Sequence, residues 1–204
     1  LAKPSKPDAA PLSAKSIKNI HGVLHKALKQ AVLIGYLRTN PTEACILPRI
    51  IRKEMHPLEE DQVAVFLREV QGHPHEYLYK IALFTGLREG EVLGLGWEHI
   101  DFQAGTLTVK RQLRREQKKG GEYYFSPPKN NKSRCLTLAP SVIQLFRLQK
   151  LEQNSMRMEA GDAWEEHGLI FTNQTGGYLS YRTVYDCFKR IIRNIGAPAT
   201  RFHD

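Results

Sequence analysis

The repeat of apolar residues along this chain changes from helical to strand-like and back, and this order limits the fold to a mixed, mainly helical one. In the first half, apolar residues recur every three or four positions, as on one face of a helix. The stretches 106–109 and 134–138 alternate instead and are rich in β-formers, which is typical of strands. Helical spacing returns from Pro140 and again from Ser180. We therefore expect an α+β protein with a small antiparallel sheet and an extended basic hairpin between its strands.

Two domains are expected from the break after the first helix. Ser13 can cap a helix that runs to about Leu37, and Asn40-Pro41 ends it, because the residue before a proline is pushed out of the α region. This helix has one apolar face, which we expect to be buried. One helix cannot form a core, so it must pack on helices upstream or on the domain that follows. We predict a first domain over residues 1–48, a basic linker over 49–57 and a second domain over 58–204.

The charge of the chain indicates a polyanionic partner. Thirty lysines and arginines face 21 acidic residues, which gives a net charge of +9, and nucleic acid is the first candidate for such a chain. The alternative is a basic but inert surface. Cations are concentrated in the expected hairpin, at Lys110, Arg111, Arg114, Arg115, Lys118 and Lys119, and they continue at Lys129, Lys132 and Arg134.

Other classes of protein fit the composition poorly. No apolar run approaches the roughly 20 residues that a bilayer crossing needs, and the N-terminus lacks the apolar core of a signal peptide. The three cysteines lie far apart without a CxxC pair, so neither a disulfide framework nor a zinc ribbon is indicated. We expect no membrane partner and a reducing, cytoplasmic location.

The stretch 85–91, Thr-Gly-Leu-Arg-Glu-Gly-Glu, places Arg88 and Glu91 at the junction of two apolar segments. A charge at such a place requires a reason, because arginine is almost never fully buried unless it is paired. The pair is either a structural ion pair at a turn or part of a functional site.

Several stretches, in this order, resemble the tyrosine recombinases, the phage integrase family. Residues 85–91, followed by Leu-Gly-Trp-Glu-His-Ile-Asp at 95–101, resemble the first conserved box of the family. Residues 128–134 resemble its β-hairpin lysine segment, and the final His203-Asp204 resembles the start of the second box. The helix that ends at Asn40-Pro41 resembles the end of the core-binding domain in integrases of temperate phages and conjugative transposons.

This resemblance implies a fold and an activity. The fold would be the end of an all-α, DNA-binding core-binding domain, followed by a mixed helical catalytic domain with a small antiparallel sheet. The activity would be site-specific recombination: the complete protein would cut and rejoin double-stranded DNA at attachment sites through a 3′-phosphotyrosyl intermediate. The resemblance implies no cofactor, a homotetramer on DNA and a bacterial or phage-encoded protein that acts in the cytoplasm.

The resemblance also implies roles for individual residues. Arg88 would be the first catalytic arginine, Glu91 the acid that organises it, and His203 the second-box histidine. Lys129 would protonate the departing 5′-oxygen. Lys132 competes with Lys129 for that role, and the preceding Pro-Pro favours Lys129. The expected DNA contacts are Lys110, Arg111, Arg114, Arg115, Lys132 and Arg134, the last being either a phosphate contact or a surface charge.

The chain also departs from the family pattern. The second-box arginine would fall two residues beyond Asp204, and none of the eight tyrosines fits the nucleophile. Leu1 is not a methionine, so we expect a fragment that is truncated at both ends, monomeric, able to bind DNA weakly and unable to cleave it.

Two alternatives to a recombinase stay open. One is a non-catalytic DNA-binding module on the same fold. The other is a metal-dependent nuclease that uses His73, His75 and Glu76, but no second ligand cluster accompanies these residues, and we expect no metal.

Overall fold

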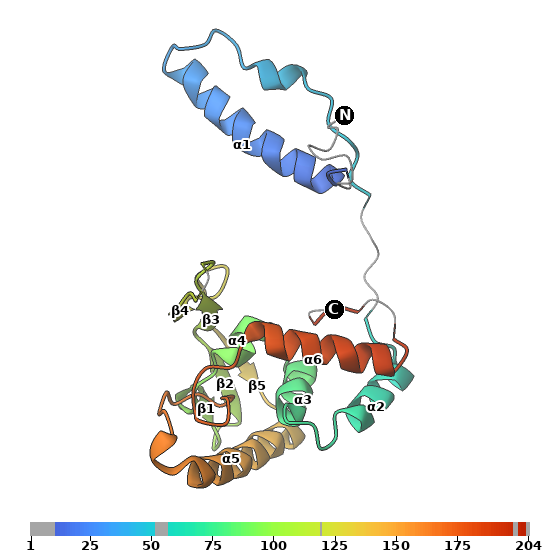
Figure 1. The fold of residues 1–204 in the computed structure, drawn as a ribbon, viewed down its shortest axis with the longest axis vertical. Helices are drawn as coiled ribbons and strands as arrows, with labels where there is room; N and C mark the ends of the chain where they lie inside the picture. Colours follow the sequence, from blue (N-terminus) through green and yellow to red (C-terminus); the bar gives the residue numbers. More distant parts are fainter. Residues whose placement is uncertain (1–10, 52–56, 119, 198–199, 203–204) are drawn as a thin grey trace. The chain divides into compact units, whose positions relative to one another are not determined.

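The computed structural model describes residues 11–51, 57–118, 120–197 and 200–202. The chain divides into two compact units, Leu1–Glu54 and Met55–Asp204, which are taken separately (Figure 1). Part of the linker predicted over 49–57 lies outside the described residues. None of the described helices is both long enough and apolar enough to span a membrane.

The first unit contains the helix α1 (Ala14–Leu33) and the short 3-10 helix η1 (Pro41–Ala44). Ser13 caps α1 as predicted, because its hydroxyl accepts a hydrogen bond from the amide of Ser16 at 3.0 Å. The predicted end near residue 37 is wrong by about one turn. Gly35 adopts a left-handed backbone conformation, with φ of 83°, and such a residue ends a helix.

Polar contacts hold α1 to η1. His21 and His25 both contact Thr42: the Nε2 atom of His21 lies 3.0 Å from the Thr42 carbonyl, and the Nδ1 atom of His25 lies 2.8 Å from its hydroxyl. Asn40 caps η1 by accepting from the amide of Thr42 at 3.1 Å. The apolar face of α1 is not buried as predicted, since the helix contains no buried residue.

In its described residues, the second unit joins five α-helices to two small sheets. The helices are α2 (Glu60–Glu69), α3 (Glu76–Thr85), α4 (Glu89–Leu93), α5 (Pro140–Ala160) and α6 (Tyr181–Asn194), with the 3-10 helices η2 (Trp97–His99) and η3 (Gly161–Ala163). A three-stranded antiparallel sheet has the order β1 (Ile100–Asp101), β2 (Thr106–Val109) and β5 (Arg134–Thr137). The predicted hairpin forms a second sheet of two strands, β3 (Gln112–Arg115) and β4 (Tyr123–Ser126).

The core of this unit is formed by α2, α3, α5 and α6 and continues to α4 and the strands β2 and β3. Phe66 of α2, Tyr79 of α3 and Phe188 of α6 contact one another as aromatic pairs with ring centroids 6.1 to 6.3 Å apart. Phe146 of α5 is fully buried in the same cluster. Each such side chain contributes about 1.5–3 kcal/mol through burial, so the helices form a stable base for the loops that they carry.

The segment 169–171 does not form the short strand that its composition favours. Within the described residues, one isolated bridge pairs Leu169 with Gly96, and the Ile170 amide donates to the Leu95 carbonyl at 3.0 Å. The side-chain amide of Gln153 on α5 donates to the carbonyls of Leu169 and Ile170, at 2.8 and 3.2 Å. A helix side chain therefore takes the place of a neighbouring strand.

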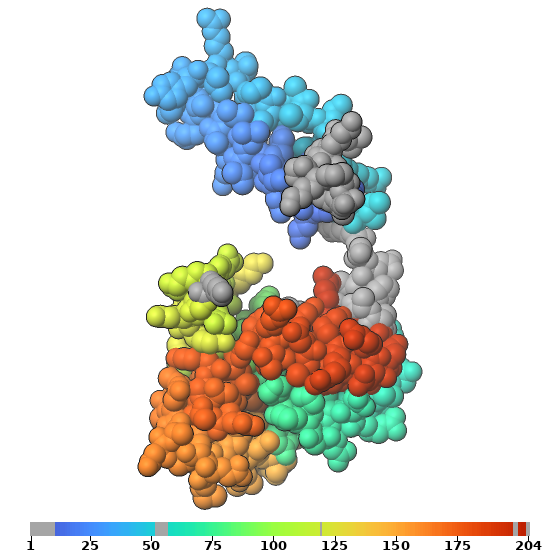
Figure 2. All heavy atoms as spheres, in the orientation of Figure 1, coloured from blue at the N-terminus to red at the C-terminus, as the bar shows by residue number. Residues whose placement is uncertain are grey.

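The hairpin lies directly against α4 because two glycines leave room for it. A Cβ atom added at Gly94 would come within 2.8 Å of the Leu113 backbone nitrogen, and one at Gly90 within 3.2 Å of the Leu113 carbonyl oxygen. Gly90 lies in α4 and Gly94 is the residue that caps its end, so the two are one helical turn apart on the same side. In Figure 2, α6 lies across one face of the second unit and the hairpin projects beside its N-terminal end.

Candidate functional site

Arg88 lies in a tight turn between α3 and α4. Gly86 ends α3 in the left-handed conformation, with φ of 63°, and the chain then extends so that Arg88 immediately precedes α4. Leu87 is buried between them and anchors the turn. The arginine side chain is 58 % exposed, whereas that of Glu91, three residues later, is 1 % exposed. The turn thus presents one cation to solvent above a buried acid.

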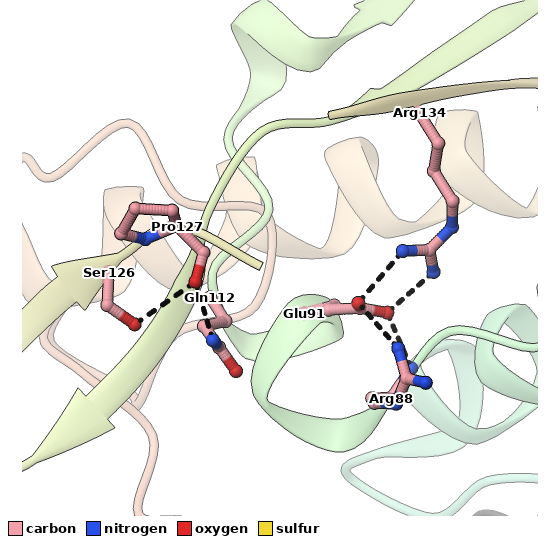
Figure 3. Close-up of polar contacts among 6 residues, drawn as sticks. All are labelled: Arg88, Glu91, Gln112, Ser126, Pro127 and Arg134. Atoms are coloured by element: carbon pink, nitrogen blue, oxygen red, sulfur yellow. Dashed lines mark hydrogen bonds and ion pairs between the residues drawn. The ribbon is translucent and has the colours of Figure 1, made fainter. Parts of the chain in front are cut away.

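Glu91 receives four hydrogen bonds (Figure 3). Its Oε1 atom accepts from Nη1 of Arg134 at 2.9 Å and from Nη1 of Arg88 at 3.3 Å. Its Oε2 atom accepts from Nη2 of Arg134 at 2.7 Å and from the backbone amide of Arg88 at 2.9 Å. Burial alone would raise the pKa of this carboxyl, but the bonds from Arg134 and the Arg88 amide hold the pKa below its usual value. The carboxylate is therefore ionised at neutral pH.

Arg134 occupies a place that the sequence did not indicate. We expected a phosphate contact or a surface charge, yet both terminal nitrogens of its guanidinium bind Glu91 as a two-pronged pair. The two residues are 43 positions apart. No local spacing could have revealed the pair.

An open cleft of about 750 Å³ lies over Arg88. Lys129 and Lys132 both line it, together with Ser133 and Phe202. Both lysines are exposed, and within the described residues neither makes an ion pair. Free ammonium groups and a guanidinium around one cleft suit the negatively charged oxygens of a phosphate.

The segment 127–133 that carries the two lysines is held at both ends. The side-chain amide of Gln112 donates to the Pro127 carbonyl at 2.6 Å, and at the other end Arg134 pairs with Glu91 (Figure 3). Asn131, in the middle, has a positive φ of 54°, which asparagine tolerates better than most residues. The segment is thus a loop that is fixed at its two ends and presents its lysines to the cleft.

The cations of the hairpin fall into two groups. Arg111 packs over the Phe125 ring at 4.1 Å and donates through Nε to the Gly94 carbonyl at 2.9 Å. Arg115 similarly packs over the Tyr123 ring at 5.2 Å. Lys110 and Arg114 are exposed, and neither makes an ion pair in the part of the chain that the structure describes. Of the four hairpin residues predicted to contact DNA, Lys110 and Arg114 are therefore the two whose charged groups are more available to a phosphate.

His203, the predicted second-box histidine, lies outside the described residues. The last described residue, Phe202, packs on Phe188 with ring centroids 5.2 Å apart and also lines the cleft.

Glu89 is a second buried acid that the sequence analysis missed. Its side chain is fully buried, and within the described residues neither carboxylate oxygen makes a hydrogen bond of ordinary geometry, although the Tyr181 hydroxyl lies close enough to interact with this carboxyl. Burial raises the pKa of Glu89 to about 7, and burial together with this nearby carboxyl raises the pKa of Tyr181 to about 12. Glu89 lies three residues before the buried Val92 on the same face of α4, but a helix of five residues is too short for this spacing to reveal the buried face from the sequence.

The histidines and the acid considered for a metal have other partners. The amide of His75 donates to Nδ1 of His73 at 3.0 Å, and Glu76 pairs with Lys80. Among the described residues, no three histidine, cysteine, aspartate or glutamate side chains are grouped so that they could hold a metal ion.

Comparison with known proteins assigns this chain to a family. The family model described as "Phage integrase family" matches residues 55–204. A protein of Caldanaerobacter subterraneus subsp. tengcongensis, named "Tyrosine recombinase XerC-like", is 28 % identical over 94 % of this chain and 53 % of its own length. An integrase of Streptomyces ambofaciens is 28 % identical over 91 % of this chain and 48 % of its own. The chain thus spans about half the length of the curated relatives that it matches.

Solved structures share the fold. The Tn1549 transposon integrase, in complex with a circular intermediate DNA, superposes with a TM-score of 0.78 at 24 % identity, over 94 % of this chain and 64 % of that one. The lambda integrase tetramer bound to a Holliday junction gives a TM-score of 0.60 at 20 % identity, over 93 % of this chain and 49 % of that one. The described α+β fold, mainly helical with a small antiparallel sheet, is the one that the sequence predicted.

Proposed function

Because this chain belongs to the phage integrase family, we propose that it is the part of a site-specific recombinase that binds double-stranded DNA and activates a phosphodiester for cleavage. The observation that supports this most directly is the placement of Arg88. Its guanidinium is open to solvent, pairs with an ionised buried acid and faces a cleft that is also lined by two lysines, neither of which makes an ion pair with a described residue.

The proposed roles follow from the chemistry of phosphoryl transfer. A tyrosine attacks the phosphorus, a 3′-phosphotyrosyl bond forms, and the bond to the 5′-oxygen breaks. Arg88 would donate hydrogen bonds to the non-bridging oxygens, where negative charge increases in the transition state. Lys129 would give a proton to the departing 5′-oxygen, and His203 would assist proton transfer at the nucleophile. Since the phosphotyrosyl link conserves the bond energy, the reaction needs no nucleotide cofactor.

The DNA contacts would extend from the cleft onto the hairpin. Lys110 and Arg114 are exposed there, and Lys132 lies at the cleft. Contacts of this kind neutralise phosphates and give binding that weakens steeply with salt. Arg111 and Arg115 would support the hairpin more than they contact DNA, because aromatic rings and backbone carbonyls already engage them.

We further propose that the nucleophilic tyrosine and the second catalytic arginine are supplied outside residues 1–204, so that these residues alone bind DNA without cutting it. Alone they would be monomeric, whereas the whole protein would act as a homotetramer on paired sites, as the lambda integrase does on a Holliday junction. It would act on DNA in the bacterial cytoplasm.

The test is to trap a covalent complex. A protein that carries this chain together with a downstream tyrosine is mixed with nicked attachment-site DNA and run on a denaturing gel. A protein–DNA adduct is expected, and Arg88→Ala is expected to abolish it while binding is mostly retained. A wild-type protein that binds DNA but never forms an adduct would instead be a non-catalytic DNA-binding module. An Arg88→Ala variant that binds poorly, yet cuts the DNA it binds, would make Arg88 a docking residue.

A further inference from the structure

The carboxylate of Glu91 accepts side-chain hydrogen bonds from two arginines, Arg88 and Arg134. Arg134 makes the two shorter side-chain bonds, at 2.9 and 2.7 Å, whereas the side chain of Arg88 makes one of 3.3 Å. Two short parallel bonds between a guanidinium and a carboxylate form the stronger kind of pair. Arg134 is therefore the principal counter-ion of Glu91, and Arg88 is the lesser one.

This division affects what Arg88 can do. A buried carboxylate must be paired with a cation, because an uncompensated charge in that environment is strongly unfavourable. If Arg134 were absent, Arg88 would be the nearest cation able to supply the pair, and its guanidinium would turn onto Glu91. With Arg134 present, the two arginines and one acid keep a net positive charge. The side chain of Arg88 stays 58 % exposed, and its bond to Glu91 is its one side-chain hydrogen bond to a described residue, so most of its five N–H donors are available to a phosphate.

Arg134 also fixes the lysine loop. It directly follows Ser133 and begins β5, where it pairs with Val109 of β2. Its ion pair therefore attaches the end of segment 127–133 to the turn that carries Arg88. Gln112 holds the other end through the Pro127 carbonyl.

We propose that Arg134 is a positioning residue for the reaction: it neutralises Glu91 so that Arg88 is free to bind the phosphate, and it holds Lys129 beside Arg88. This inference rests on the proposed function, because it assigns Arg134 a part in the same site. It also differs from the expectation drawn from the sequence, in which Arg134 would contact DNA itself.

The first measurement needs no DNA. Arginine side-chain NMR spectra of the 204-residue chain are compared between wild type and Arg134→Met. In the wild type, the guanidinium of Arg134 is expected to be ordered and that of Arg88 to rotate freely. In Arg134→Met, the Arg88 guanidinium should become ordered, because it takes over the pair with Glu91. An Arg88 signal that is unchanged in the variant would overturn the proposal, whether or not the chain proves to be a recombinase.

The second measurement separates positioning from DNA contact. Duplex affinity, its salt dependence and the single-turnover rate at saturating DNA are measured for Arg134→Met in a protein that carries the nucleophilic tyrosine. We expect unchanged affinity and salt slope and a rate that falls by about 100-fold, as misplaced catalytic groups cause. A log–log salt slope that drops by about 0.9, with the rate at saturation unchanged, would make Arg134 a phosphate contact.

Two further variants keep the result interpretable. Arg157→Met removes an exposed arginine that pairs with Glu166 at 3.0 Å, and it should change neither affinity nor rate. Arg134→Lys keeps the charge but lacks the planar fork, so it should fold even if Arg134→Met does not, and it should recover only a small part of the rate. Full recovery by lysine would show that the geometry of the pair is unimportant, which would also overturn the proposal.

Discussion

The hydroxyl of Tyr79 donates a hydrogen bond of 2.8 Å to the backbone carbonyl of Val184, 105 residues further along the chain. Tyr79 lies on α3, the helix that leads into the Arg88 turn, and Val184 lies on α6. Both residues are buried, and burial raises the pKa of the Tyr79 hydroxyl well above its usual value. The bond therefore connects α3, the helix that leads into the Arg88 turn, to α6.

Removing this hydroxyl should destabilise the second unit. Tyr79→Phe removes a buried hydrogen bond that the Val184 carbonyl accepts in addition to its bond within α6, and we expect the free energy of unfolding to fall by about 1–2 kcal/mol. Urea denaturation followed by circular dichroism would measure the loss. Tyr124→Phe removes the same group from an exposed ring on the hairpin and should change stability by less than about 0.5 kcal/mol. Equal effects of the two substitutions would contradict this account of the Tyr79 bond.

Glu89 should make the stability of the fold depend on pH. Its pKa is about 7 in the folded protein, against an ordinary value of 4.5. Between these two values the folded chain binds the proton more tightly than the unfolded chain does. Stability is therefore expected to fall as the pH rises from about 4.5 to 7 and to level off above that, with a total loss of at most about 3 kcal/mol.

The substitution Glu89→Gln isolates this effect. Glutamine carries no charge at any pH, so the variant should lack this part of the pH dependence and exceed the wild type in stability at pH 8. Urea denaturation at several pH values between 5 and 8 provides the measurement. Glu159→Gln, at an exposed position, should keep the wild-type profile. A Glu89→Gln profile that runs parallel to the wild type would show that Glu89 does not titrate in this range.

The two lysines of the cleft should separate by function. Lys129→Ala is expected to slow cleavage by about 10²–10⁴-fold, the usual contribution of a general acid, with DNA binding little changed. Lys132→Ala should mainly weaken binding and lower its salt dependence. Single-turnover cleavage at saturating DNA distinguishes the two. The reverse result, with cleavage lost in Lys132→Ala and kept in Lys129→Ala, would transfer the catalytic role to Lys132.

The hairpin arginines should separate in a similar way. Arg114→Ala is expected to reduce the log–log salt slope of DNA binding by about 0.9 and to leave stability within about 0.5 kcal/mol of wild type. Arg111→Ala should instead destabilise the fold by about 1–2 kcal/mol, because it removes a cation–π contact and a hydrogen bond to Gly94. Affinity at several salt concentrations, together with urea denaturation, tests both. If the two variants showed the same salt slope and the same stability, Arg114 and Arg111 would not have the separate roles proposed here.

Most of the fold could be predicted from local patterns. The helices α2, α3, α5 and α6, the strands β2 and β5 and the basic hairpin follow from apolar spacing and turn residues, which act over a few positions. The end of α1 was predicted wrongly, and the segment 169–171 does not form the strand that its composition favours. In the first case Gly35 ends the helix before Asn40-Pro41 can, and in the second the amide of Gln153 satisfies carbonyls that a strand would otherwise pair.

The site could be predicted only in part, for a related reason. Arg88 and Glu91 are three residues apart, so their association is visible in the sequence. The bond between Arg134 and Glu91 joins residues 43 positions apart and depends on how β5 returns beside α4. The placement of Glu89 depends on which face of α4 meets the core, and a five-residue helix is too short to show that face clearly.

The glycines of α4 have a mechanical consequence. The backbone of β3 lies against Gly90 and Gly94 with no side chain between them, so the hairpin is in direct backbone contact with the helix that follows Arg88. A displacement of the hairpin would therefore be passed directly to α4. A DNA duplex that moves the tip of the hairpin would thus also move Arg88 and Glu91. An added methyl group at Gly94 would push the strand β3 away from the end of α4.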